Sequence, residues 1–147
     1  MRKPKSFCIA VEFLLLPIFL SAYVGAAGKV DIAEFGIRSA VIDYYIKGLQ
    51  TRDFNLIRAI CLPEAELMSA GTDGKLHVTT LERWSRRFDP NNPPFQSLDY
   101  TILKIDREGT AAQVKILFIK DGKQRITDYL HMLDLDGRWR IAHIIDF

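Results

Sequence analysis

Cysteine is scarce in this chain, whose 147 residues contain only Cys8 and Cys61. Cys8 lies in an N-terminal segment that we expect to be removed, so Cys61 would have no partner for an internal disulfide even in an oxidising compartment. Because Cys61 ends an apolar helix face, we interpret it as a small buried hydrophobic residue rather than as a reactive thiol. The cysteine count therefore predicts a fold without disulfides.

Metal-binding and phosphate-binding spacings are also missing. The histidines His77, His131 and His143 form no H-x-x-x-H or Glu-x-x-His pair, and no cysteine cluster accompanies them. The segment GTDG at residues 71–74 lacks the lysine and the helix that a phosphate-binding loop requires, and is typical of a turn. We therefore expect no metal site and no cofactor.

An excess of charge of either sign is absent from most of the chain. The formal net charge of +2 equals that of the N-terminal segment alone, which carries Arg2, Lys3, Lys5 and Glu12, so the remaining residues are close to neutral. Nucleic-acid binding depends on Lys and Arg side chains that neutralise phosphates. We therefore expect no nucleic-acid partner.

The N-terminus has the three parts of a secretory signal: a basic start, an apolar run over residues 13–24 and the small residues Gly25, Ala26 and Ala27. We expect cleavage near Ala27, which leaves a domain of residues 28–147 that is exported to the periplasm or secreted. Glu12 disfavours the alternative, a retained membrane-spanning anchor. No cysteine follows the small residues to mark a lipoprotein, so we expect no stable membrane anchor after cleavage.

Helical signals dominate the first half of the remaining chain. Asp31 with Glu34 resembles a capping box and predicts a helix over residues 32–50, with apolar stripes on two sides that would clamp it between neighbours. Asp53 can cap a second helix over residues 54–61, which Pro63 ends. Thr79 with Glu82 predicts a third, short helix through residue 88.

Strand signals dominate the second half. A strand pair is expected at residues 66–70 and 76–78, followed after the proline-rich loop at 89–94 by four long strands over residues 95–147. Asp-Gly pairs at 121–122 and 136–137 are typical of tight hairpin turns, so these strands should form an antiparallel meander. Helices followed by a large sheet indicate one α+β domain with the helices packed on one face of a curved antiparallel sheet.

Three stretches resemble the nuclear transport factor 2-like superfamily, whose fold is a cone-shaped, cystatin-like roll around a pocket. AVIDYYIKGLQTRDFNLIRAI (residues 40–60) is similar to the opening helices of that superfamily, and LERWSRRF (residues 81–88) to its short third helix. DYLHMLDLDGRWRIAHIIDF (residues 128–147) resembles the ending of the branch called putative lumazine-binding proteins. The resemblance spans residues 31–147 and implies a small-molecule ligand, while the superfamily includes both enzymes and proteins without catalysis.

The resemblance also directs attention to particular residues. Laid against ketosteroid isomerase, the oxyanion-hole tyrosine of that enzyme falls at Tyr45, its general base at Ser69 and its second acid at about His131. A serine cannot take a proton at neutral pH unaided, so the isomerase mechanism does not carry over. By alternation along the strand, Tyr129 shares a face with His131, and if that face lines the cone, His131 could contact a ligand as a donor, acceptor or base. The alternative is a half-buried histidine that is bonded to a tyrosine or to the backbone. We expect Asp128, on the opposite face, to be solvated.

The candidate ligand-binding residues are Tyr45, Ser69, Trp84, Tyr129 and His131. The leading hypothesis is an exported domain that binds a small, mostly apolar or aromatic molecule in its cone. A second hypothesis is a lyase, isomerase or hydrolase that uses His131 with Tyr45. A third is a homodimeric interaction module that associates through a sheet face containing Leu130 and Met132.

Overall fold

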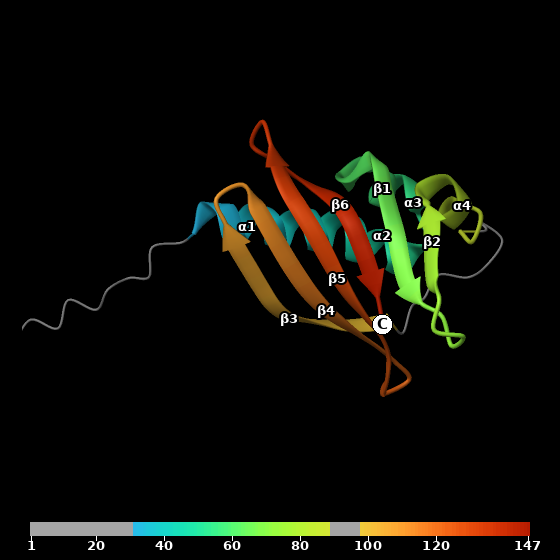
Figure 1. The fold of residues 1–147 in the computed structure, drawn as a ribbon. Coiled ribbons are helices and arrows are strands. Elements are labelled where there is room, and N and C mark those ends of the chain that lie inside the picture. The colour runs from blue at the N-terminus through green and yellow to red at the C-terminus, as the bar shows by residue number, and fades with distance from the viewer. Residues whose placement is uncertain (1–30, 89–97) are drawn as a thin grey trace, which may run out of the picture.

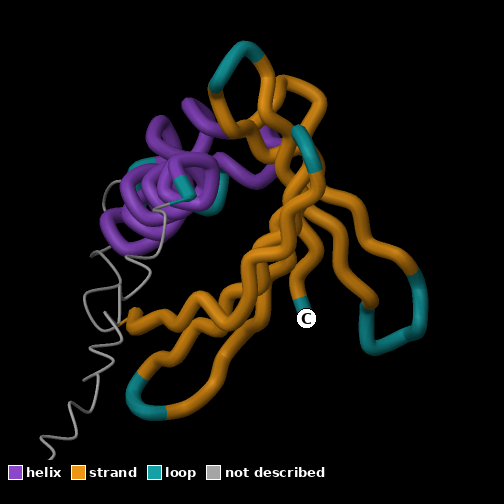
Figure 2. The backbone as a smooth tube through the Cα atoms, turned by 90° about the vertical axis from the view of Figure 1, so that its left-hand side faces the viewer, coloured by secondary structure: helices purple, strands orange, loops and turns teal. Residues whose placement is uncertain are grey.

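A layer of helices covers one face of a six-stranded sheet, and the sheet curves toward the helices (Figures 1 and 2). This computed structural model describes residues 31–88 and 98–147. The expected cleavage site near Ala27 and the proline-rich segment at 89–94 lie outside the described residues, so the domain boundary stays a prediction. Within the described ranges, no helix is both long enough and apolar enough to cross a membrane.

The predicted first helix is confirmed and contains a change of pitch. Helix α1 (Ile32–Ala40) continues into the π-helix η1 (Val41–Ile46) and then into α2 (Lys47–Thr51). The Asp31 carboxylate caps its start by accepting hydrogen bonds from the backbone N–H groups of Ala33 and Glu34 at 3.0 and 3.2 Å. A π-helix is rare because its i→i+5 hydrogen bonds form wider turns, and it is frequent at functional sites.

Both expected apolar stripes of the first helix contribute to the core. Ile37 and Val41 of one stripe and Ile46 of the other are buried, while Phe35 and Tyr44 remain 67% and 43% exposed. Among the described residues the helices form one layer on one face of the sheet (Figure 2), so parts of both stripes stay at the surface.

The next two helices are short and pack around the end of the first. Asp53 caps α3 (Phe54–Ile60) as expected, and Gly48 of α2 permits close contact, since a Cβ there would lie 2.6 Å from Ile57 Cγ1. The cap of α4 (Leu81–Ser85) is Thr80, whose hydroxyl accepts from the Arg83 N–H, and not Thr79. Thr79 instead lies buried in the preceding strand, which extends two residues further than expected.

The sheet has the strand order β2-β1-β6-β5-β4-β3. The predicted meander is confirmed as β3 (Leu98–Glu108), β4 (Ala111–Lys120), β5 (Lys123–Leu135) and β6 (Arg138–Asp146), and the predicted strand pair as β1 (Cys61–Ala70) and β2 (Leu76–Thr80). β1 runs parallel to β6, so the sheet is mixed rather than wholly antiparallel. No hairpin joins these two strands, and a long connection permits the parallel arrangement.

The Asp-Gly turns adopt the backbone conformation that their sequence predicts. Asp121 and Gly122 have φ values of 54° and 70°, and Asp136 and Gly137 have values of 55° and 75°. Positive φ at both central residues matches the right-handed twist of the flanking strands. These turns fix the pairing of β4 with β5 and of β5 with β6.

The two faces of β5 are reversed relative to our expectation. Leu130 and Met132 are 0% and 1% exposed beneath the helices, and Asp128 beside them is 4% exposed. The expected solvation of Asp128 and the expected dimer surface at Leu130 and Met132 are therefore wrong. Strand alternation assigns residues to two faces, but it does not determine which face the helices cover.

Candidate functional site

A cavity of about 370 Å³ lies between the first helix and the concave face of the sheet, and we call it the cone cavity. Its volume lies within the usual range for small-molecule sites, which is about 300–1,000 Å³. It is lined by residues from every layer of the fold: Tyr45, Leu49, Leu67, Trp84, Arg87, Leu98, Phe118, Lys120, Arg125, Ile126, Asp128 and Asp146.

Tyr45 lies on the side of the first helix that faces the sheet. It follows Val41 by four residues, so the two side chains share a side of the helix even at the regular α-helical period. A π turn holds more residues than an α turn, so each residue of η1 advances by a smaller angle and Tyr45 lies closer to the line of Ile37 than an α-helix would place it. Its side chain is 1% exposed.

The hydroxyl of Tyr45 donates a hydrogen bond of 2.6 Å to Asp128 Oδ2. Burial raises the pKa of Asp128 from 3.8 to about 7, although the Tyr45 hydrogen bond opposes that rise. Burial also raises the pKa of Tyr45 far above its usual value, and the Asp128 charge adds to this effect. The pair therefore holds one carboxyl group that can gain or lose a proton near neutral pH, next to a phenol that stays protonated.

Asp128 has an unused hydrogen-bonding oxygen. Its Oδ1 atom is buried without a partner among the described residues, and Oδ1 of Asp146 is in the same condition. The two aspartates are register partners on β5 and β6, and both line the cone cavity. Since buried polar atoms are nearly always hydrogen-bonded in folded proteins, two unpaired carboxylate oxygens beside a cavity indicate a place for a ligand group or for water.

Trp84, which lines the cavity, belongs to a cluster of aromatic side chains. Trp84 on α4 lies 6.4 Å from the Tyr45 ring and 5.5 Å from the Phe54 ring, measured between ring centroids. Phe88 completes this cluster, with its centroid 5.6 Å from that of Trp84. The near-perpendicular contacts of Trp84 with the two phenylalanines are favourable for aromatic pairs and fix the position of its ring.

Two of the five candidate ligand-binding residues, Tyr45 and Trp84, line the cone cavity. Ser69 shares a face with Asp146, its register partner across β1 and β6, but it is not among the lining residues. Tyr129 and His131 lie on the convex face, where Lys115 Nζ sits 5.2 Å from the Tyr129 ring centroid and the Gln113 amide contacts His131 Nε2 at 2.9 Å. The structure thus separates His131 from Tyr45, so the two cannot act on one substrate in this cavity.

Asp128 is the site residue that sequence reasoning missed. Its residue type gave no sign of burial, because an aspartate is usually solvated. One signal was present: Asp128 shares its strand face with Leu130 and Met132, whose apolar side chains are typical of a core-facing position.

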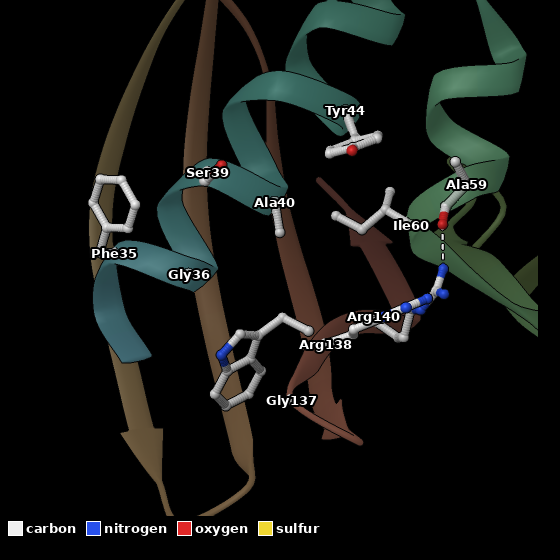
Figure 3. A pocket seen from close by; sticks show the side chains of 11 residues that line it. Phe35, Gly36, Ser39, Ala40, Tyr44, Ala59, Ile60, Gly137, Arg138 and Arg140 are labelled. Atoms are coloured by element: carbon white, nitrogen blue, oxygen red, sulfur yellow. Dashed lines mark hydrogen bonds between the residues drawn. The ribbon is translucent and has the colours of Figure 1, made fainter. Parts of the chain in front are cut away.

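A second cavity of about 500 Å³ lies outside the cone, between α1 and the turn that joins β5 to β6 (Figure 3). On the helix side the cavity is lined by Gly36 and by the small side chains of Ser39 and Ala40, and Arg138 and Arg140 lie on the opposite side (Figure 3). The Arg140 guanidinium donates to the Ala59 carbonyl oxygen at the end of α3, and Ser39 Oγ donates to Asp43. No buried, unpaired side-chain atom of the described residues belongs to the lining of this cavity, so it lacks the feature that marks the cone cavity.

Neither cavity has the ligands for a metal ion. Among residues 31–88 and 98–147, no group of three or more His, Cys, Asp or Glu side chains is placed to hold one. Asp128 and Asp146 provide only two carboxylates. Cys61 is buried, and burial raises the pKa of its thiol to about 12, which leaves it protonated and unreactive.

Comparison with known proteins identifies a family and a fold. A family model described as putative lumazine-binding matches residues 33–144. A nuclear transport factor 2-like protein of unknown function from Shewanella baltica has 23% sequence identity and a TM-score of 0.70, and the match covers 81% of this chain and 96% of that one. One from Silicibacter pomeroyi has 15% identity and a TM-score of 0.67, with 81% and 98% covered.

A further structural neighbour is the association domain of CaMKII from Caenorhabditis elegans, with 18% identity and a TM-score of 0.58 over 78% of this chain and 95% of that one. No curated protein matches the sequence. At these identities the structural neighbours establish the fold and leave the ligand open.

Proposed function

Because the chain belongs to the putative lumazine-binding family, with a nuclear transport factor 2-like α+β fold, we propose that it binds a small, mostly apolar or aromatic molecule in the cone cavity. Leu49, Leu67, Phe118 and Ile126 supply apolar surface, and Trp84 supplies an aromatic face. Apolar walls with a few placed polar groups are typical of small-molecule sites.

The observation that carries this proposal is the unpaired Oδ1 atom of Asp128. An acceptor that is buried without a partner costs about 1–3 kcal/mol, and the cost falls when a bound molecule donates a hydrogen bond to it. Tyr45 holds the carboxyl group in place through its other oxygen. The cavity is therefore prepared to recognise a donor group before a ligand arrives.

Lumazine is a suitable first probe, because it is a planar bicyclic ring with N–H donors and it fluoresces. We expect the purified protein to gain thermal stability with rising lumazine concentration, since a ligand that binds only the folded state stabilises it. Substituting Leu49→Trp should fill part of the cavity and abolish that gain. Leu133→Trp, on the convex face, is the matched control and should retain it. A midpoint that no concentration of lumazine or of related bicyclic rings moves would refute the proposal.

We also propose that the domain is exported to the periplasm or secreted after cleavage near Ala27. The basic, apolar and small-residue parts of the N-terminal segment support this. Expression of the full chain in a bacterial host, followed by mass measurement of the periplasmic fraction, tests it. Recovery of the full-length mass in the cytoplasm alone would contradict export.

Homodimer formation is a second candidate function. Leu133 and Leu135 of β5, Leu103 of β3 and Ile145 of β6 are exposed, and exposed apolar side chains on the outer side of a sheet favour association. The match to an association domain in CaMKII gives the idea further support. Sedimentation should show a dimer that the double substitution Leu133→Lys and Leu135→Lys dissociates, whereas a monomer at high protein concentration would exclude it.

A further inference from the structure

The lining of the cone cavity carries groups of opposite charge that differ in burial. The carboxyl group of Asp128 is buried, at 4% exposure, and that of Asp146 is half-buried. The side chains of Arg87, which follows α4, and Arg125 on β5 are exposed, and Lys120 is half-buried. Since exposed side chains lie nearer to solvent than buried ones, we take the aspartates as the buried end of the cavity and the arginines as its mouth. Apolar side chains, among them Leu67 and Ile126, also belong to the lining.

We infer that the ligand is a polar-ended molecule: it carries an N–H or other hydrogen-bond donor at one end, an acidic group such as a carboxylate or phosphate at the other, and a flat apolar body between them. The inference rests on the proposed function and narrows it to a class of ligand. The donor would bond Asp128 Oδ1, and the acidic group would lie between Arg87 and Arg125 at the mouth.

The ligand would bind with its donor at the buried end because an acidic group there would be repelled. An acidic group at the buried end would meet Asp128 and Asp146 in a region of low dielectric constant, where repulsion between like charges is strong. A donor at that end instead fills the hydrogen-bonding capacity of two oxygens that have no partner among the described residues.

The two arginines have a different role from the aspartate. Their side chains are solvent-exposed, so each ion pair with a ligand contributes little affinity, and salt screens it. A positive mouth in front of an apolar cavity does, however, attract and orient an acidic molecule. We therefore expect the hydrogen bond to Asp128 to contribute most of the affinity, and the two arginines to orient the ligand as it enters.

Three fluorescent probes of similar size separate these contributions. Lumazine-6-carboxylate carries both the N–H donors and the acid, lumazine carries only the donors, and 2-naphthoate carries only the acid. We expect lumazine-6-carboxylate to bind the protein most tightly, lumazine about threefold more weakly because an exposed ion pair is lost, and 2-naphthoate at least tenfold more weakly because the donor is lost.

Substitutions assign each effect to its end of the cavity. Asp128→Asn should weaken both lumazines by about tenfold or more and leave 2-naphthoate unchanged or tighter, since it removes the buried charge. Arg87→Ala with Arg125→Ala should weaken lumazine-6-carboxylate severalfold and leave lumazine unchanged. The matched controls are His131→Ala, on the opposite face of β5, and Arg138→Ala, outside the cone, and neither should change any affinity. Circular dichroism of each variant establishes that it is folded.

The outcomes distinguish this inference from the proposed function. If none of the three probes binds, both fail. Equal affinity for all three probes would mean that the cavity binds flat molecules whatever polar groups they carry. The same would follow if Asp128→Asn weakened the binding of 2-naphthoate as much as that of the lumazines. Either result would leave the proposed function standing and overturn the inference. Tighter binding of 2-naphthoate than of lumazine would show the reverse orientation and would likewise overturn it.

Discussion

The two faces of β5 contain similar residues in opposite environments. On the concave face, Asp128 and Leu130 are buried under the helices, and Asp128 contributes to the cone cavity. On the convex face, His131 is half-buried beside Gln113, and Leu133 is 37% exposed. The comparison shows that a titratable side chain and a leucine can be buried next to a cavity or remain at the surface, according to the face of the strand on which they lie.

The largest expected effect comes from the buried carboxyl group. Folding raises the pKa of Asp128 from 3.8 to about 7, so between these pH values the folded chain holds a proton that the unfolded chain has lost. The contribution of Asp128 to stability therefore falls as the pH rises from about 4 to about 7 and stays low above that range. Asp128→Asn should abolish this loss, and its stability relative to the native protein should rise by about 4 kcal/mol across that range.

Chemical denaturation of both proteins at about pH 4, pH 6 and pH 8 measures this difference. Asp99→Asn, which changes an exposed carboxylate on β3, is the control and should give a small difference at every pH. A difference between the native protein and Asp128→Asn that does not depend on pH would show that Asp128 is not desolvated.

The leucines of β5 offer the next largest contrast. Leu130→Ala removes a fully buried side chain and should cost about 3 kcal/mol of unfolding free energy through lost burial and a new cavity. Leu133→Ala makes the same chemical change on the convex face and should cost less than about 1 kcal/mol. Denaturation midpoints measure both. Equal losses would mean that a second layer covers the convex face in solution, as a dimer would.

The two tyrosines give a smaller contrast. Tyr45→Phe deletes the donor to Asp128 Oδ2 and leaves that buried oxygen unpaired, which should cost about 2 kcal/mol at a pH above 7. Tyr129→Phe, on the convex face, should change stability by less than about 0.5 kcal/mol. Thermal unfolding monitored by circular dichroism compares the two variants. A stable Tyr45→Phe protein with unchanged ligand binding would show that the hydroxyl does not position Asp128.

The smallest effect is expected for the histidine. His131→Ala should alter stability by less than about 0.5 kcal/mol, because the imidazole is half-exposed and its contact is with the amide of Gln113 at 2.9 Å. The melting temperature of the variant tests this. A loss of several kcal/mol would indicate that His131 is buried in an assembly that covers the convex face.

Much of the fold could be predicted because it depends on local signals. Asp-Gly pairs favour the positive φ values of tight turns, so they predicted the hairpins on both sides of β5. Asp31 and Asp53 predicted the helix starts, since their side chains cap the first turns. The motif at residues 128–147 also indicated the family whose model matches residues 33–144. The parallel pairing of β1 with β6 had no such signal, because it joins strands that are distant in the sequence.

The candidate site was predicted only in part. Tyr45 and Trp84 were candidates for the cavity and line it, whereas Asp128 was expected in solvent and lines it too. Of the two interpretations of His131, the structure agrees with a half-buried histidine outside the cone, since it contacts the Gln113 amide on the convex face. The π-helix η1 had no sequence signal, and it turns Tyr45 further toward the line of Ile37 than the regular helical period does.

The sequence by itself determined the elements, the turns between them and the division of β5 into two sets of alternating residues, because local backbone geometry decides all three. Only the tertiary structure decided which set faces the helices. That choice depends on where α1, η1 and α2 pack against the curved sheet, and it placed Asp128 against Tyr45 at 2.6 Å in the cone cavity while it left His131 on the convex face.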